Sequence, residues 1–297
     1  MTERVSVNAG RLRADVALSG PADGPPLLLL HGWPDSARTY DALLPALHTN
    51  GWRTIVPSLC GYGQTHVERG PADAAPEDLG LDALALLSAL NIERAALVGH
   101  DWGARAAYAA AFHAPERIYA CITLSVGYDG LSGPDAPLTP AHAQNFWYQW
   151  WFATRHGEAA LRRDPAPLIR HIWQIWAVRP TGDAADHAIA AAQNPDWADA
   201  TLSYYRVRWG EAEPSESATA IRARMAQNPI ISVPTLLLQG GADPCTPPSL
   251  SANKEHRFAG PYKREVLDGV GHFPQLEAPQ AVLRAMLPFL AAHSPAQ

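Results

Sequence analysis

Apolar residues follow two patterns in the first half of the chain. In residues 5–18, apolar and polar residues alternate on both sides of Asn8-Ala9-Gly10, as in a hairpin with one buried face. Runs of consecutive apolar residues follow, separated by helix-like stretches such as 79–90. The runs occupy residues 27–30, 54–56, 95–98 and 121–124. Unbroken apolar strands spaced by helices are typical of a parallel sheet buried on both faces, so we predict such a sheet with an antiparallel edge.

A different pattern extends from about residue 127 to about residue 225. This segment holds seven of the ten tryptophans and has helical periodicity at 144–155 and 167–177. Strand patterns then return and a helical segment follows, at residues 233–239, 263–267 and 279–291. We therefore predict an α/β core interrupted by an inserted helical cap domain. The predicted division is residues 1–127 and 226–297 for the core and 128–225 for the cap.

The composition excludes several classes of protein. A chain of 297 residues with 47% hydrophobic and 18% charged residues is expected to fold into a packed, enzyme-sized body. Its net charge of -6 and pI near 6.0 give no basic surface for nucleic acid. No apolar run is long enough to cross a bilayer and the first twenty residues lack a secretory pattern, so we expect no membrane partner and a cytoplasmic location. The spacing of Cys60, Cys121 and Cys245 indicates neither a disulfide framework nor a metal site.

The stretch 95–104 has the form of a nucleophile elbow. A predicted strand runs into Gly99-His-Asp-Trp-Gly103, and an alanine-rich helix follows at 104–112. The two glycines permit the close approach of strand and helix that lifts the middle side chain above the sheet. That side chain is Asp101. A carboxylate there suits attack at carbon and formation of an alkyl ester, which water must then hydrolyse.

Two downstream residues have the chain order expected for a catalytic triad on this elbow. Asp243 follows the predicted strand at 233–239, and His272 follows the last predicted strand. Both therefore lie at the carboxyl ends of strands, where open α/β sheets place their sites. We predict that Asp243 orients His272 and that His272 activates the water. Asp129, after the strand at 121–124, is the alternative acid.

The turn His31-Gly32-Trp33-Pro34 follows the strand at 27–30 and matches a loop that supplies an oxyanion-hole donor. We predict that the backbone N–H groups of Trp33 and Trp102 stabilise the oxyanion formed when the Asp101 ester is hydrolysed.

Together with Gly61-Tyr62-Gly63, these motifs make the whole chain resemble the epoxide hydrolase and haloalkane dehalogenase branch of the α/β-hydrolase superfamily. The resemblance implies an α/β-hydrolase fold with a cap and a reaction that needs no cofactor and no metal. In epoxide hydrolases, two cap tyrosines donate hydrogen bonds to the epoxide oxygen. The segments at 146–149 and 203–206 are similar to the family's two tyrosine segments and assign this role to Tyr148 and Tyr205, with Tyr204 as a substitute. The implied activity is opening of an epoxide to a vicinal diol.

The aromatic cap further predicts an apolar pocket for a small hydrophobic substrate. Its expected contacts are Trp33, Trp102, Phe146 and Trp151. The other histidines, including His31, His100 and His171, are expected to be structural or exposed, because no metal spacing links them. The sequence leaves open the preferred substrate and whether the protein is a monomer or a homodimer.

Two other functions stay open. A haloalkane or haloacid dehalogenase would use the same Asp101 chemistry, but many haloalkane dehalogenases carry Asn where this chain has Trp33. Haloacetate dehalogenases typically carry Arg directly after the nucleophile, where Trp102 stands, and only Arg105 one turn later matches. The third candidate is a hydrolase-fold binding protein without turnover, which would have no need for His272 beside an acid.

Overall fold

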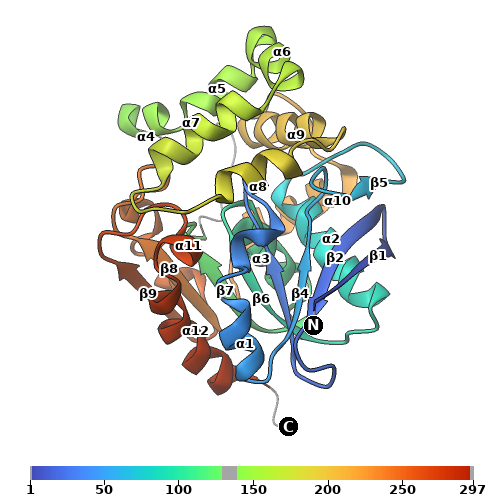
Figure 1. Ribbon diagram of the computed structural model, residues 1–297, viewed down its shortest axis with the longest axis vertical. Coiled ribbons are helices and arrows are strands. Elements are labelled where there is room, and N and C mark those ends of the chain that lie inside the picture. Colours follow the sequence, from blue (N-terminus) through green and yellow to red (C-terminus); the bar gives the residue numbers. More distant parts are fainter. Residues whose placement is uncertain (1, 129–138, 295–297) are drawn as a thin grey trace.

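A single mixed sheet forms the centre of the protein (Figure 1). The structure is a computed structural model that describes residues 2–128 and 139–294. Within these residues the strands are β1 (Glu3–Ala9), β2 (Leu12–Ser19), β3 (Pro26–Leu30), β4 (Arg53–Pro57), β5 (His66–Val67), β6 (Ala95–His100), β7 (Ile118–Leu124), β8 (Thr235–Gly240) and β9 (Tyr262–Leu267). Their order across the sheet is β1-β2-β4-β3-β6-β7-β8-β9, and β5 pairs with β2.

The strand directions confirm the predicted fold class. β1 and β2 form the antiparallel hairpin, with Val5 opposite Val16, and β2 also pairs antiparallel with β4. From β4 to β9 every neighbouring pair is parallel. The two-residue strand β5 was not predicted, because two residues are too few to show a periodicity.

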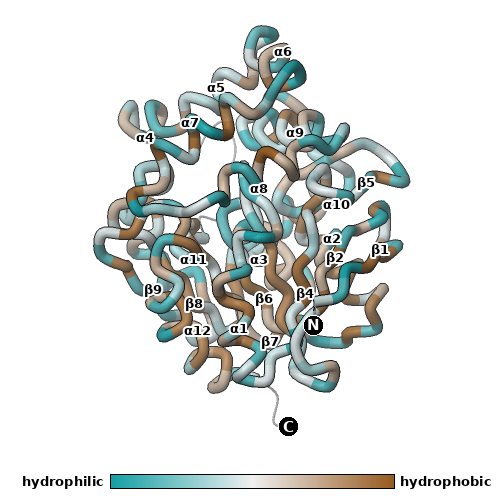
Figure 2. Tube along the Cα trace, viewed as in Figure 1, coloured by the Kyte–Doolittle hydropathy of each residue, from teal (hydrophilic) through white to brown (hydrophobic). Residues whose placement is uncertain are grey.

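Both faces of the inner parallel strands β3, β6, β7 and β8 are buried, as their unbroken apolar runs require. Leu27 and Leu29 of β3 belong to the apolar cluster on one face, and Leu28 and Leu30 belong to the cluster on the other. Figure 2 shows the hydrophobic strands enclosed by helices whose outer positions are more polar. The helices that cover the faces are α1 (Leu44–Thr49), α2 (Pro76–Ala89), α3 (Trp102–His113) and α12 (Pro279–His293).

A group of helices lies between β7 and β8 in the sequence. Figure 1 shows α4 to α9 gathered above the sheet, at the place predicted for the cap. These helices and the one that follows are α4 (Pro140–Asn145), α5 (Trp147–Phe152), α6 (Arg155–Arg163), α7 (Ala166–Trp176), α8 (Ala184–Ala191), α9 (Trp197–Trp209) and α10 (Glu216–Gln227). α10 packs on α2 of the core, and Arg222 of α10 forms an ion pair with Glu77 of α2 at 3.0 Å. The cap boundary expected at residue 225 therefore falls inside a helix that contacts the core.

One predicted cap helix, at 144–155, is wrong in its extent. The structure divides this region among α4, α5 and α6. The last break has a local cause: the Thr154 hydroxyl accepts a hydrogen bond from the Gly157 backbone N–H at 3.0 Å and so starts a new helix as its N-cap.

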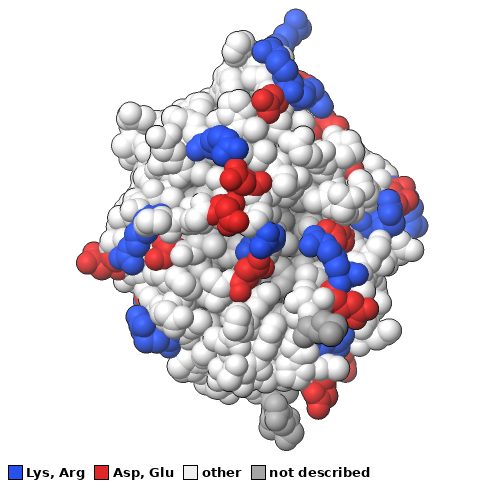
Figure 3. Space-filling model, viewed as in Figure 1, with Lys and Arg blue, Asp and Glu red and all other residues white. Residues whose placement is uncertain are grey.

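The surface carries acidic and basic side chains of both signs. On the face shown in Figure 3 they are interspersed, without a large area of one sign. No helix in the described part of the chain is long and apolar enough to cross a membrane.

The junction of β3, β6 and α3 is packed too closely for any side chain at Gly103. A Cβ built there would lie 2.0 Å from the Leu30 carbonyl oxygen, which is backbone and cannot rotate away. We expect Gly103→Ala to lower the free energy of unfolding by about 3 kcal/mol or more, because α3 must move away from β3. Urea denaturation measures this change.

Gly182→Ala is the matched control. Its Cβ would meet no atom within 4 Å, and only its φ of +61° disfavours alanine. A loss of about 1 kcal/mol is expected for this substitution. Equal losses for the two variants would contradict the close approach of strand and helix.

Candidate active site

Asp101 stands at the turn between β6 and α3 in a rarely populated backbone conformation. Its φ is 50° and its ψ is -111°, and a positive φ is uncommon for a residue other than glycine. Such conformations persist where the surrounding packing enforces them, and they gather at functional sites. The sharp turn places the Asp101 carboxylate at the carboxyl end of β6, as the elbow motif predicted.

The Asp101 carboxylate lies between a backbone donor and an imidazole. Its Oδ1 accepts a hydrogen bond from the Trp33 backbone N–H at 2.9 Å. Its Oδ2 lies 3.6 Å from His272 Nε2. The Trp33 backbone N–H thus contacts the carboxylate directly. Its role as an oxyanion-hole donor stays a prediction, as does that of the backbone N–H of Trp102, the residue directly after Asp101.

His272 is held on its other side by Asp243. The Nδ1 nitrogen lies 2.8 Å from Asp243 Oδ2, and both side chains are buried. Asp243 also accepts hydrogen bonds from the backbone N–H groups of Cys245 and Thr246, at 2.8 and 2.9 Å, and from the Thr246 hydroxyl. These donors fix the carboxylate that orients the imidazole. The alternative acid, Asp129, lies outside the described residues.

The two carboxylates control the charge of His272. Burial disfavours the imidazolium, but Asp243 beside Nδ1 and Asp101 beside Nε2 outweigh burial and raise the pKa of His272 to about 10. The same contact acts on Asp101: burial opposes its ionisation, but His272 lowers the pKa of the carboxyl overall. At neutral pH the pair therefore consists of a carboxylate and an imidazolium.

A second buried pair, Asp35 and His100, contacts the backbone of His272. His100 Nε2 lies 2.8 Å from the His272 carbonyl oxygen, and a carbonyl can only accept, so this nitrogen carries the proton. Nδ1 is then an acceptor, and it faces Asp35 Oδ2 at 3.7 Å. Burial raises the pKa of Asp35 to about 7 and lowers the pKa of His100 to about 3. The Ser125 hydroxyl donates to the same carbonyl at 2.7 Å and fixes it further.

The other histidines named from the sequence have structural surroundings. His31 Nε2 accepts from the Leu59 backbone N–H at 3.0 Å, and the ring of His171 lies against that of Trp147. In residues 2–128 and 139–294, no three His, Cys, Asp or Glu side chains are grouped so as to hold a metal ion.

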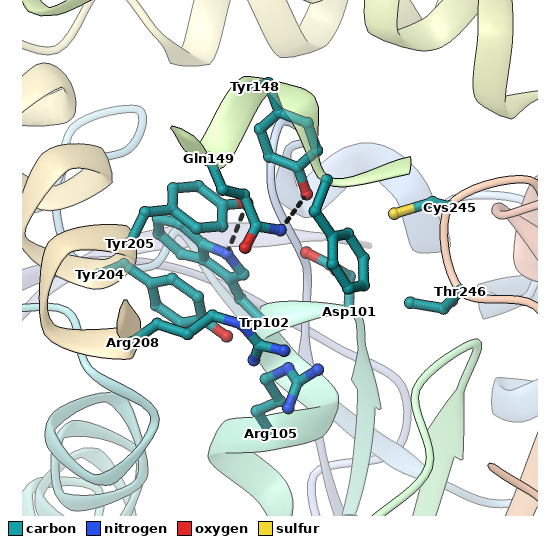
Figure 4. A pocket seen from close by; sticks show the side chains of 11 residues that line it. Asp101, Trp102, Arg105, Tyr148, Gln149, Tyr204, Tyr205, Arg208, Cys245 and Thr246 are labelled. Atoms are coloured by element: carbon teal, nitrogen blue, oxygen red, sulfur yellow. Dashed lines mark hydrogen bonds between the residues drawn. The ribbon is translucent and has the colours of Figure 1, made fainter. Parts of the chain in front are cut away.

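A pocket opens above Asp101 between the core and the helices over it (Figure 4). It contains about 260 Å³ of space, part of it open to solvent. The residues that line it are Asp101, Trp102, Arg105, Phe146, Tyr148, Gln149, Tyr204, Tyr205, Arg208, Cys245 and Thr246. Trp33 and Trp151, two expected substrate contacts, are not among these described lining residues. Trp33 stacks on Tyr148 at 4.9 Å and so lies behind it, and the ring of Trp151 packs against Trp147.

The two tyrosines expected from the cap segments meet in this pocket. Tyr148 of α5 and Tyr205 of α9 have ring centroids 5.3 Å apart, with their rings nearly perpendicular. Burial raises the pKa of both phenols above its ordinary value, so both are neutral donors. Tyr204 also lines the pocket, but its ring stacks on the Trp102 indole at 3.9 Å.

Several residues of the site were missed by the sequence analysis. Gln149 and Thr246 follow shortly after predicted site residues, and that adjacency was the one available signal. Arg208 lies one helical turn after Tyr204 and Tyr205, but a surface arginine on a helix has the same appearance in a sequence. Asp35 follows the His-Gly-Trp-Pro turn directly and reads as an ordinary turn residue.

Comparison with known proteins agrees with this geometry. Residues 25–279 match the α/β-hydrolase fold family. The chain belongs to that family. Epoxide hydrolase A of Mycobacterium tuberculosis is 30% identical to this α/β hydrolase, with 97% of each chain covered. A Klebsiella pneumoniae protein regarded as a candidate epoxide hydrolase is 34% identical, with a TM-score of 0.89 over 97% of this chain and 96% of that one. Epoxide hydrolase A of Mycobacterium thermoresistibile is 25% identical, with a TM-score of 0.80 over the full length of both chains.

The raised pKa of His272 links protonation to stability. An unfolded histidine titrates near pH 6.5, so the folded state binds the extra proton more tightly. This stabilisation is fully present below pH 6.5 and is lost as the pH rises through about 10. We expect the free energy of unfolding to fall by on the order of 4 kcal/mol across that range. Urea unfolding at several pH values measures the loss.

Asp243→Asn tests the cause of this loss. Removing the carboxylate beside Nδ1 lowers the pKa of His272, so the variant is expected to lose less than half as much stability between pH 6.5 and 10. An unchanged pH dependence in Asp243→Asn would contradict the assignment to His272.

Proposed function

We propose that this α/β hydrolase is an epoxide hydrolase that works through a covalent ester on Asp101. The observation that carries the proposal is the position of Asp101 between the Trp33 N–H and His272, in one pocket with Tyr148 and Tyr205. A nucleophile faces two buried acids across a small cavity, as opening of a strained ring requires. The names of the relatives support the same activity.

In the first step an Asp101 oxygen attacks one carbon of the epoxide. The carbon–oxygen bond of the ring breaks, and its electron pair stays on the ring oxygen. Tyr148 and Tyr205 hydrogen-bond to that oxygen, and one of them transfers its proton to it, so that the oxygen becomes a hydroxyl on the neighbouring carbon and the tyrosine becomes a phenolate. The product is a hydroxyalkyl ester of Asp101.

Ester formation also changes His272. The Asp101 carboxylate is one of the groups that raise its pKa, and esterification removes that negative charge. The pKa of His272 therefore falls after the first step, and its proton passes, directly or through water, to the tyrosine phenolate. This transfer restores the phenol and leaves a neutral imidazole. The timing suits a base that is needed only in the second step.

In the second step water attacks the ester carbonyl carbon. His272 Nε2 accepts a proton from the water, and Asp243 stabilises the resulting imidazolium. The backbone N–H groups of Trp33 and Trp102 stabilise the oxyanion. Collapse of this intermediate releases the vicinal diol and restores the Asp101 carboxylate.

The proposal also covers the substrate, the cellular location, the oligomeric state and the extent of the cap. Phe146, Trp102 and the tyrosine rings favour a small apolar epoxide. We place the enzyme in the cytoplasm as a monomer or homodimer, and we assign the helical cap to residues 128–225.

Dehalogenation of an alkyl halide or a haloacid is the second candidate, and one observation separates it from the first. A halide needs N–H donors, and the Trp102 indole N–H already donates to the Tyr205 hydroxyl at 3.2 Å. That hydrogen bond favours the arrangement of an epoxide hydrolase. A non-catalytic binding protein is the third candidate.

Product analysis separates the three functions. With styrene oxide the wild-type enzyme is expected to give diol, and with a short alkyl halide or a haloacetate it is expected to release little halide. Asp101→Ala should lose diol formation, since no other described side chain replaces the nucleophile. Full turnover by Asp101→Ala would overturn the mechanism, and halide without diol would establish a dehalogenase.

His272→Gln separates the two chemical steps. Loss of a general base slows water activation by about 10²- to 10⁴-fold but leaves Asp101 able to attack. We expect the variant to accumulate enzyme whose mass is raised by one substrate molecule, with the adduct on the peptide that contains Asp101. Rapid diol formation by His272→Gln with no adduct would rule out His272 as the base.

A further inference from the structure

Gln149 lies next to Tyr148 on α5, and its amide is held at both ends. Gln149 Oε1 accepts a hydrogen bond from the Trp209 indole N–H at 2.8 Å. Gln149 Nε2 donates to the Tyr148 hydroxyl oxygen, also at 2.8 Å (Figure 4). Gln149 is itself buried, and its hydrogen bond to Tyr148 is buried as well, whereas its hydrogen bond from Trp209 is partly buried.

The chemistry of the indole fixes the direction of this chain of hydrogen bonds. An indole N–H can only donate, so the amide oxygen must face Trp209. The amide nitrogen must then face Tyr148, where it can only donate. The Tyr148 oxygen is therefore an acceptor toward Gln149, and its own proton points elsewhere.

Tyr205 has a matching arrangement. The Trp102 indole N–H donates to its hydroxyl oxygen at 3.2 Å, which again leaves the phenol proton directed away from the donor (Figure 4). The Tyr148 and Tyr205 rings lie 5.3 Å apart in the lining of the same pocket, and an epoxide oxygen between their hydroxyls would accept a hydrogen bond from both.

We propose that Gln149 is a positioning residue for ring opening, which directs the Tyr148 proton to the epoxide oxygen and stabilises the phenolate, with Trp209 holding the amide in that orientation. This inference rests on the proposed epoxide hydrolase function. As the Tyr148 proton moves to the leaving oxygen, negative charge builds on the phenol oxygen that Gln149 contacts. A buried phenol is otherwise a weak acid, since burial raises the pKa of Tyr148.

The hydrogen bonds from Trp209 to Gln149 and from Gln149 to Tyr148 also join the two helices that carry the tyrosines. Gln149 lies on α5 with Tyr148, and Trp209 lies at the end of α9, four residues after Tyr205. The ring of Trp209 packs on Trp150 at 4.3 Å, which fixes the indole that orients the amide. These two hydrogen bonds therefore set the direction of the Tyr148 proton and also the spacing between α5 and α9.

The test measures the two chemical steps separately with styrene oxide, by rapid quench and mass spectrometry of the Asp101 ester. Gln149→Leu removes the donor to Tyr148 and is expected to slow ester formation by about 10- to 100-fold, the effect of losing one hydrogen bond to a developing charge. Hydrolysis of the ester should keep its wild-type rate, because Gln149 has no part in that step.

Gln149→Glu keeps the shape of the side chain, and it tests the inference independently if the leucine variant misfolds. Its carboxylate accepts from both Trp209 and Tyr148, which takes the Tyr148 proton away from the epoxide. We expect ester formation at neutral pH to be slowed at least as much as in Gln149→Leu.

Trp209→Phe removes the indole donor and keeps a ring, and a loss of about 3- to 10-fold in ester formation is expected. Trp52→Phe is the control. It removes a buried indole that packs in the apolar cluster of Leu27 and Leu29, which contains none of the pocket residues, and it should leave both rates unchanged.

Wild-type ester formation in both Gln149 variants would overturn the inference, and so would equal slowing of both steps with a lowered Tm. Absence of any ester or diol in the wild type would instead overturn the proposed function, and this inference with it.

Discussion

One buried imidazole between two carboxylates is the interaction on which the rest of the site depends. His272 lies 2.8 Å from Asp243 and 3.6 Å from Asp101, and its side chain has no exposed surface. The three groups share one low-dielectric volume, so the charge of His272 depends on both carboxylates. The strained turn at Asp101, the donors around Asp243 and the contact from His100 all serve to hold these groups in place. A change in the charge of Asp101 alone is therefore enough to change the protonation of His272.

The fold and the three residues Asp101, Asp243 and His272 could be predicted because they depend on local patterns and chain order. The unbroken apolar runs gave the parallel strands, and the glycines beside Asp101 gave the elbow. Chain order then led to Asp243 and His272, since the carboxyl ends of parallel strands share one edge of the sheet. The cap tyrosines came from resemblance to a family, and the structure brings both of them to the pocket. In these cases the information lies within a few residues of the side chain concerned.

The remaining features depend on distances that no local pattern contains. Gln149 has its role because Trp209, sixty residues later, faces its amide oxygen. Asp35 is buried against His100 only after β3 and β6 lie side by side. Trp33 was expected in the pocket, but Tyr148 stacks on its face and separates it from that space. The order of aromatic layers in a cap follows from packing, which composition does not determine.

The central claim is that Asp101 supplies the oxygen that opens the epoxide. A single turnover in ¹⁸O-labelled water, with enzyme in excess over styrene oxide, tests it most directly. The account predicts an unlabelled diol, because its new oxygen comes from Asp101, and a label in the peptide that contains Asp101, because water attacks the ester carbonyl. A labelled diol together with an unlabelled Asp101 peptide would show that water opens the ring itself and would contradict the account.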